Sequence, residues 1–269
     1  MSIAKEDRFY GARFIDLDAL IGGFHPDIAK EILGALDEAT LETIRFTRVS
    51  TVLNLMAKGG LVGWAFNLGI NGMQDLAKKG HSLSDLELAQ LQALLKDFGW
   101  SPHITRDKAA DRGTRAHKIA EKLGRGLSLE TAQALAEALP EDERGYGRAA
   151  CRYFEEVKPV VLATEKLLYS LENRYCGTTD SIELEQLPVG EIECIVDYKT
   201  SKNVYDSHGV QLAAYELARA EMTGDGSFRS NKVVLFRPDG TFKQVYTDVD
   251  PSAFLGLLAA FRALKQKEE

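Results

Sequence analysis

The decisive stretches of this sequence are YCGTTD at residues 175–180 and EIECIVDYKT at residues 191–200. Both are rich in residues that favour strands, and Pro188 between them marks a turn, so two neighbouring strands are predicted. Alternate side chains of a strand point to opposite faces, which places Asp197 and Lys199 together on one face. The other face carries the largely apolar set Ile192, Cys194, Val196 and Tyr198, which is expected to meet the core.

The two strands carry a set of side chains suited to metal chemistry. If they pair, Asp180 and Asp197 converge with Lys199 within a few ångströms. Two nearby carboxylates repel unless a cation lies between them, and their oxygens suit Mg²⁺ or Mn²⁺. A neighbouring ammonium offsets charge that develops on a phosphate or helps to deprotonate an attacking water. The simpler alternative is a solvated strand face with an ion pair.

The segments around these strands predict an α/β fold, with a mixed central sheet flanked by helices. Further strands are expected at 160–171, 231–240 and 241–249, the last two as a hairpin, and helices at 207–221 and 252–265.

The N-terminal half is expected to be helical, because apolar residues recur there every three or four positions. Helices are predicted at 27–45, 50–58, 61–78, 84–98, 113–123 and 128–139. Ser84 and Ser128 are expected to cap two of them, and residues 1–44 carry no motif. We therefore predict a helical region at 1–105, packed on the core, and a core domain at 106–269.

Composition excludes several classes of protein. Hydrophobic residues make up 45% of the chain and charged residues 27%, as in a folded globular protein. No apolar stretch is long enough for a membrane helix, and the N-terminus lacks the apolar region of a secretory signal, so a cytoplasmic location is expected. The cysteines Cys151, Cys176 and Cys194 include no CxxC pair, and Cys176 and Cys194, which lie in apolar strand-like runs, are expected to be buried thiols.

The formal net charge of −7 argues at first sight against nucleic acid as a partner, but its distribution is uneven. Seven basic residues and three acidic ones lie between Arg106 and Arg125. Two solvated helix faces would explain the basic clusters equally well.

Five motifs occur in an informative order: Gly113–His117 (GTRAH), Glu165, Gly177–Asp180 (GTTD), Asp197–Lys199 (DYK) and Gln211–Tyr215 (QLAAY). This order and spacing resemble the RecB-like nucleases of the PD-(D/E)XK superfamily, which also includes lambda exonuclease and CRISPR-associated nucleases. The resemblance covers roughly residues 113–250. It implies a restriction-endonuclease-like core.

The resemblance also implies roles for individual residues. Asp180 would be the central metal ligand, Asp197 the second acid and Lys199 the residue that orients the water and stabilises the pentacovalent phosphate. His117 would add a metal ligand and Glu165 would support the site. A surface position for His117 is the simpler alternative, and Glu121 on the same helix face is expected to pair with Lys118 or Arg125.

Further residues are expected to bind metal or substrate. The main-chain carbonyl of Tyr198 would complete the metal shell. Gln211 and Tyr215, one helical turn apart, would hold the catalytic lysine or contact a phosphate, although Tyr215 alternatively packs under the sheet. Arg115, Arg48 and Trp64 are expected to contact DNA by charge and stacking, with a core position as the alternative for Trp64.

The function implied is hydrolysis of DNA phosphodiester bonds with one or two Mg²⁺ or Mn²⁺ ions, as an exonuclease in recombination, repair or phage DNA processing. DNA is the expected partner in a bacterial or phage-infected cell, with a separate helicase or single-strand annealing protein, because no GxxxxGK[ST] motif is present. The three cysteines do not match an iron–sulfur pattern. The alternatives are an inactive DNA-binding module of the same fold, or a sugar or nucleotide hydrolase with an accidental DxK.

Overall fold

The fold is taken from a computed structural model that describes residues 5–7, 12–14, 45–56, 60–188, 190–226 and 229–265. The chain forms two compact units: the described parts of Met1–Met56 and Ala116–Glu269 make the first, and those of Ala57–Arg115 the second. This division differs from the expected boundary at 105/106, because the first unit draws on both ends of the chain. None of the described helices has the length and apolar character needed to cross a membrane.

The first unit is built on a mixed β-sheet, as predicted. Its strands are β1 (Lys5–Asp7), β2 (Ala12–Phe14), β3 (Arg45–Arg48), β4 (Val160–Ser170), β5 (Tyr175–Leu187), β6 (Gly190–Lys199), β7 (Ser230–Phe236) and β8 (Phe242–Tyr246). Strand β5 pairs with β4 along one edge, and along the other with β3 and then β6. The pairs β3–β5 and β6–β7 are parallel and the others antiparallel.

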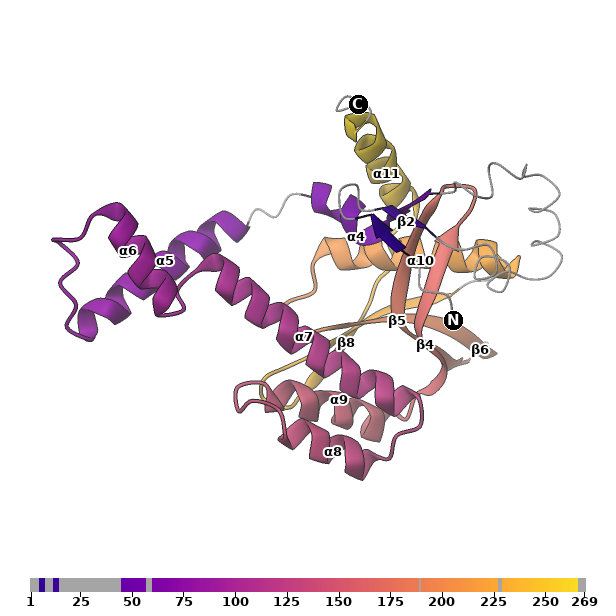
Figure 1. The fold of residues 1–269 in the computed structure, drawn as a ribbon. Coiled ribbons are helices and arrows are strands. Elements are labelled where there is room, and N and C mark those ends of the chain that lie inside the picture. Colours follow the sequence, from indigo (N-terminus) through magenta and orange to yellow (C-terminus); the bar gives the residue numbers. More distant parts are fainter. Residues whose placement is uncertain are drawn as a thin grey trace. The chain divides into compact units, whose positions relative to one another are not determined.

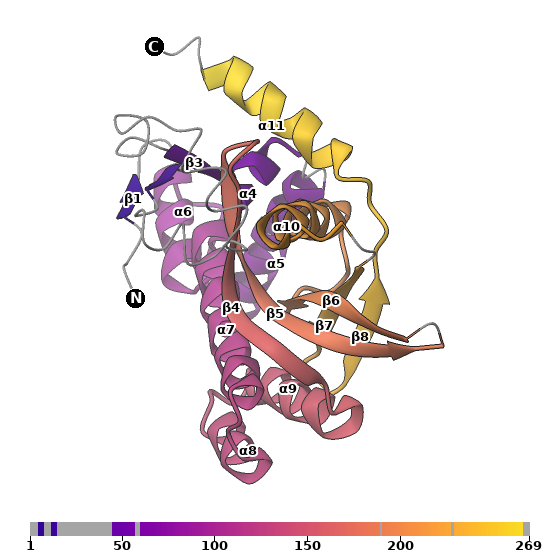
Figure 2. The same cartoon turned by 90° about the vertical axis from the view of Figure 1, so that its right-hand side faces the viewer.

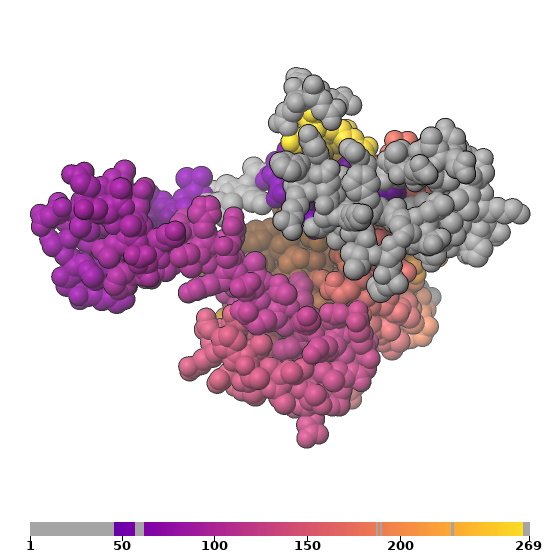
Figure 3. Space-filling model, viewed as in Figure 1, coloured from indigo at the N-terminus to yellow at the C-terminus, as the bar shows by residue number. Residues whose placement is uncertain are grey.

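Helices cover both faces of this sheet (Figures 1 and 2). On one face, α10 (Asp206–Thr223) and α11 (Ser252–Lys265) pack on a core that includes Ile195 and Val233. On the other, α8 (Leu129–Glu137), α9 (Arg144–Val157) and the last turns of α7 (Pro102–Gly124) form one continuous packed layer (Figure 3).

The alternation predicted for β6 is confirmed. Cys194, Val196 and Tyr198 belong to the core under α7–α9, whereas Ile195 belongs to the core under α10. The face that carries Asp197 is therefore covered by a helix, and the side chain of Asp197 is 3% exposed. The alternative of a solvated strand face does not describe this residue.

The expected helices of the N-terminal half are correct in part. Helix α5 (Gly60–Lys78) and α8 match the predictions, and Ser128 caps α8 by accepting from Thr131 N at 3.3 Å. Helix α7 begins eleven residues before the predicted 113, and α9 was not predicted, because its small and polar residues carry few large apolar side chains.

Three expectations in this half are wrong. Arg45, the predicted last residue of the helix at 27–45, instead begins strand β3, and residues 27–44 lie outside the described part. The segment 50–58 is reduced to α4 (Val49–Val52) and a 3₁₀ turn at Leu53–Leu55, with 57–58 not described. Ser84 caps no helix: its hydroxyl donates to Asp85, and α6 (Leu88–Asp97) begins after Glu87.

The second unit contains α5, α6 and the first turns of α7 as far as Arg115. Trp100 joins its elements by donating from Nε1 to Asp75 Oδ2 at 3.1 Å, and Asp75 also pairs with Lys79 at 2.8 Å. Few of its apolar side chains are buried, Leu76 being fully so.

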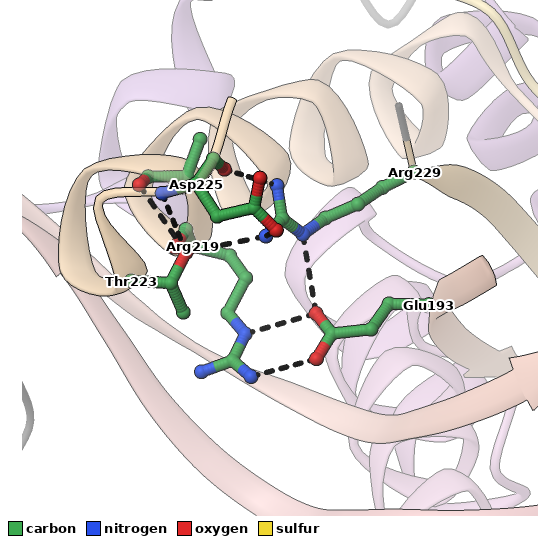
Figure 4. Close-up of polar contacts among 6 residues, drawn as sticks. Glu193, Arg219, Thr223, Asp225 and Arg229 are labelled. Carbon is green, nitrogen blue, oxygen red and sulfur yellow. Dashed lines mark hydrogen bonds and ion pairs between the residues drawn. The ribbon is translucent and has the colours of Figure 1, made fainter. Parts of the chain in front are cut away.

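A cluster of charged side chains ties β6, α10 and β7 together (Figure 4). Glu193 accepts hydrogen bonds from Arg219 at 2.8 and 3.1 Å and from Arg229 Nε at 3.1 Å. The side chain of Arg229 is only 3% exposed, so its charge depends on these partners. The Arg219 hydrogen bonds, followed by the charges of Arg219 and Arg229, hold the pKa of Glu193 below its ordinary value.

We expect Glu193→Gln to lower the free energy of unfolding at pH 7 by about 2 kcal/mol, because it leaves the buried Arg229 guanidinium with only the longer 3.5 Å ion pair to Asp225. The pKa of Glu193 is lower in the folded chain than in the unfolded one. Its contribution is therefore complete above pH about 4.3 and is lost as the pH falls through the folded pKa. Urea denaturation at a series of pH values measures the difference in the free energy of unfolding between the variant and the wild type.

The matched control is Glu191→Gln on the same strand, where the carboxylate is exposed and partnered by Gln186. This variant is expected to stay close to wild type at every pH. A Glu193→Gln gap that is absent at pH 7, or that widens in acid, would contradict the assignment.

Candidate active site

The candidate site lies where β5 and β6 separate. Their last ladder pair is Ser181 with Val196, which places Asp180 and Asp197 next along the register. Beyond this pair, a side chain replaces a main-chain carbonyl as the hydrogen-bond acceptor between the strands: Tyr198 N donates to Asp180 Oδ2 at 2.6 Å. The carboxylate of Asp180 is thus fixed to the main chain of the strand that carries Asp197 and Lys199.

Asp197 and Lys199 form a close pair on the face covered by α10. Lys199 Nζ donates to Asp197 Oδ1 at 2.6 Å, and Gln211 Nε2 from α10 donates to the same oxygen at 3.3 Å. The side chain of Lys199 is 22% exposed, so the ammonium reaches the edge of the site. The structure therefore brings the two acids and the lysine together at one point.

His117 joins the site from α7. Its Nδ1 lies 3.4 Å from Asp180 Oδ1, and its ring meets the ring of Tyr198 edge-on at a centroid distance of 6.1 Å. Burial lowers the pKa of His117, but the charge and hydrogen bond of Asp180 outweigh this effect and raise it. The alternative of a surface histidine does not fit, because the side chain is 24% exposed and faces the acids.

The two acids have opposite pKa shifts. Burial raises the pKa of Asp197 to about 6, and the charge of Asp180 adds to this against the attraction of Lys199. Burial acts on Asp180 in the same direction, but His117, Lys199 and the Tyr198 N–H outweigh it and lower its pKa. Burial also lowers the pKa of Lys199, and the two carboxylates reverse this and raise it. Asp180 is therefore the acid better prepared to stay ionised.

Glu165 on β4 lies at the register position opposite Asp180, between the pairs Thr164–Ser181 and Lys166–Thr179. Its φ of +48° is rare for a residue with a side chain. Burial, followed by the negative charges of Asp180 and Glu121, raises the pKa of the Glu165 carboxyl. Glu121 itself pairs with Arg125 at 2.7 Å, which was the expected partnership.

Gln211 and Tyr215 act on the acid rather than on the lysine. Gln211 Nε2 donates to the hydroxyl of Tyr215 at 3.0 Å as well as to Asp197. Tyr215 is 3% exposed and packs beside Gly177, as the packing alternative expected. The space beside Gly177 is filled by the Tyr215 ring.

The expected DNA contacts are distributed over both units. Arg48 ends β3, where its Cα pairs with that of Cys176, one residue before Gly177. Trp64 on α5 and Arg115 on α7 belong to the second unit. Trp64 is 37% exposed and so is not a core residue. The three cysteines are free and buried; burial was expected for Cys176 and Cys194.

One residue near the site was missed from the sequence. His208 lies in the first turn of α10, and burial followed by the charge of Lys199 lowers its pKa to about 4. Its Nδ1 accepts a hydrogen bond from Tyr205 N at 3.4 Å. Its position in the sequence could have indicated it, because His208 lies at the start of the helix that follows the strand with the DYK motif.

The donor atoms of the site fit a hard divalent cation. Lys199 Nζ lies close to both carboxylate oxygens of Asp197, 2.6 Å from Oδ1 and 2.5 Å from Oδ2, and the contact with Oδ2 lacks the geometry of a hydrogen bond. Within the same part of the chain, no group of three or more His, Cys, Asp or Glu side chains is close enough to hold a metal ion by itself. Mg²⁺ commonly binds through one or two carboxylates and keeps several waters, which two acids and a carbonyl would allow.

Comparisons with known proteins give no relative from which a function can be transferred. No known protein family matches the sequence. No curated protein matches it either.

Gly177→Ala is expected to disturb the site through Tyr215. A Cβ at this position would lie 2.4 Å from Tyr215 Cε1 and 2.9 Å from its hydroxyl, so the ring must move. We expect the free energy of unfolding to fall by about 1–3 kcal/mol, as for other overpacked cores. Chemical denaturation measures this change.

Gly256→Ala on α11 is the control, because a Cβ there meets nothing within 4 Å. It is expected to leave stability unchanged or raise it by about 0.5–1 kcal/mol, since alanine favours a helix over glycine. Equal effects of the two substitutions would contradict the close approach of Tyr215 to Gly177.

Proposed function

We propose that this chain is a metal-dependent deoxyribonuclease of the RecB-like branch of the PD-(D/E)XK superfamily, with a restriction-endonuclease-like core. The observation that carries the proposal is the convergence of Asp180, Asp197 and Lys199 where β5 and β6 separate. The element order β4-β5-β6-α10-β7, with β6 and β7 parallel, supports it. The positions of the other motif residues support the proposal: His117 and Glu165 lie beside Asp180, and Gln211 donates to Asp197.

Asp180 and Asp197 would hold one or two Mg²⁺ or Mn²⁺ ions, with the carbonyl of Tyr198 and His117 as further ligands. A bound cation would supply a water of lowered pKa and neutralise charge on the phosphate. The protein's own part is to keep Asp180 ionised, through His117 and the Tyr198 N–H, and to fix Asp197 through Gln211.

Lys199 is suited to stabilise the phosphate by its charge. The carboxylates of Asp197 and Asp180 raise its pKa above the ordinary value, which keeps the amine protonated at neutral pH. A protonated amine is an electrostatic catalyst rather than a base, so Lys199 would offset the negative charge that builds up in the transition state. Glu165, opposite Asp180, would support the same centre from β4.

The substrate would be DNA, attacked from its ends as an exonuclease in recombination, repair or phage DNA processing. Arg48, Arg115 and Trp64 would supply backbone and stacking contacts, and a separate helicase or single-strand annealing protein would deliver the substrate. End attack is an inference from the family, and circular DNA is the substrate that separates it from internal cleavage.

Lys199→Met is expected to reduce cleavage of end-labelled linear DNA in Mn²⁺ by about 100-fold or more, because the charge facing the phosphate is lost. Asp180→Ala is expected to abolish it. A time course with single- and double-stranded DNA, linear and circular, with and without EDTA, measures both. Circular dichroism checks that each variant is folded.

Lys202→Met is the matched control, since this lysine is exposed and follows Lys199 by three residues. It is expected to keep wild-type cleavage. Full activity of folded Lys199→Met, or activity that survives EDTA, would refute the mechanism, and DNA binding without any cleavage would identify an inactive binding module.

A further inference from the structure

A buried polar network lies on the opposite face of the sheet from Asp197. Glu183 on β5 accepts from Tyr153 at 2.6 Å, from Tyr198 at 3.2 Å and from Lys232 at 3.2 Å. All four residues are at most 2% exposed. Lys232 also donates to Glu185 Oε1 at 2.9 Å, so every charge in the network is partnered.

Stability alone is a poor explanation for this network. Moving a carboxylate and an ammonium out of water costs several kcal/mol per ion, and apolar side chains of similar size commonly stabilise a core as well or better. Hydrogen bonds, by contrast, are directional, so they fix the positions of the side chains that they join. The network fixes Tyr198, whose ring also stacks on Phe236 at a centroid distance of 5.2 Å.

Tyr198 is the one member whose main chain belongs to the candidate site. Its N–H donates to Asp180 Oδ2 at 2.6 Å, and its ring edge contacts the ring of His117. Its neighbours in sequence are Asp197 and Lys199. A shift of the Tyr198 side chain would therefore move the hydrogen bond to Asp180 and the packing of His117 together.

We propose that the Tyr198–Glu183 hydrogen bond is a positioning contact, which holds the main chain of β6 so that Asp180 and Asp197 present a preformed cation site. The proposal rests on the function proposed above and adds Tyr198 and Glu183 as positioning residues. They act through the main chain of β6 and through His117, and touch neither cation nor substrate with their side chains.

Tyr153 supplies a closely matched control. It donates to the same carboxylate from the same face, is fully buried, and likewise contacts Phe236, at 6.5 Å. It lies on α9, however, and has no main-chain contact with Asp180. Tyr153→Phe and Tyr198→Phe each remove one hydroxyl from Glu183, so their general effects on stability should be alike.

The experiment compares the two variants by titration with Mn²⁺ alone, followed by electron paramagnetic resonance, and by amide hydrogen exchange at Tyr198 without metal. Tyr198→Phe is expected to weaken Mn²⁺ binding about tenfold, as for other residues that support metal ligands. It should also speed exchange of the Tyr198 amide. Tyr153→Phe should leave both quantities near wild type, while the two melting temperatures fall by similar amounts.

The positioning role would be overturned if the two variants had the same Mn²⁺ affinity and the same rate of Tyr198 amide exchange, whether both values stayed near wild type or both changed. Failure of the wild-type protein to bind Mn²⁺ would count against the proposed function instead. In that case the amide exchange still shows whether the Tyr198 hydroxyl fixes the hydrogen bond to Asp180.

Discussion

The hydrogen bond from Tyr198 N to Asp180 is the constraint on which the site depends. It forms where the ladder between β5 and β6 stops, so a side-chain carboxylate replaces a main-chain acceptor at the separation of two strands. This bond brings one acid to the strand that carries the other acid and the lysine. Two neighbouring carboxylates, Asp197 buried and Asp180 half-buried, repel each other without compensating charge, which Lys199 and His117 supply.

Both faces of the sheet contribute to this arrangement. The α10 side provides Gln211, which holds Asp197, and Tyr215, which fits against Gly177. The opposite side provides His117 and the buried bonds that anchor the ring of Tyr198. Side chains on both faces of β6 therefore hold the strand in position. Nearer its first residue, Arg219 and Arg229 hold the same strand through their ion pairs with Glu193.

The sequence predicts the C-terminal part well because its strands alternate and its turns carry Pro and Gly. The position of Asp180 beside Asp197, next along the register after Ser181 and Val196, follows from that alternation and a hairpin register. Longer-range features have no local signal: β3 was not predicted, and its pairing partners β2 and β5 lie far from it in the sequence. The network around Glu183 and Lys232 was equally hidden, since charged residues in a strand are normally expected to be exposed.

The central claim is that Asp180 and Asp197 share a cation. A crystal soaked with Mn²⁺, with data collected at the manganese absorption edge, tests it directly. The account predicts an anomalous peak about 2.1–2.3 Å from one carboxylate oxygen of each acid and near the carbonyl of Tyr198. Ordered carboxylates with no peak between them, or manganese bound only elsewhere on the chain, would contradict it.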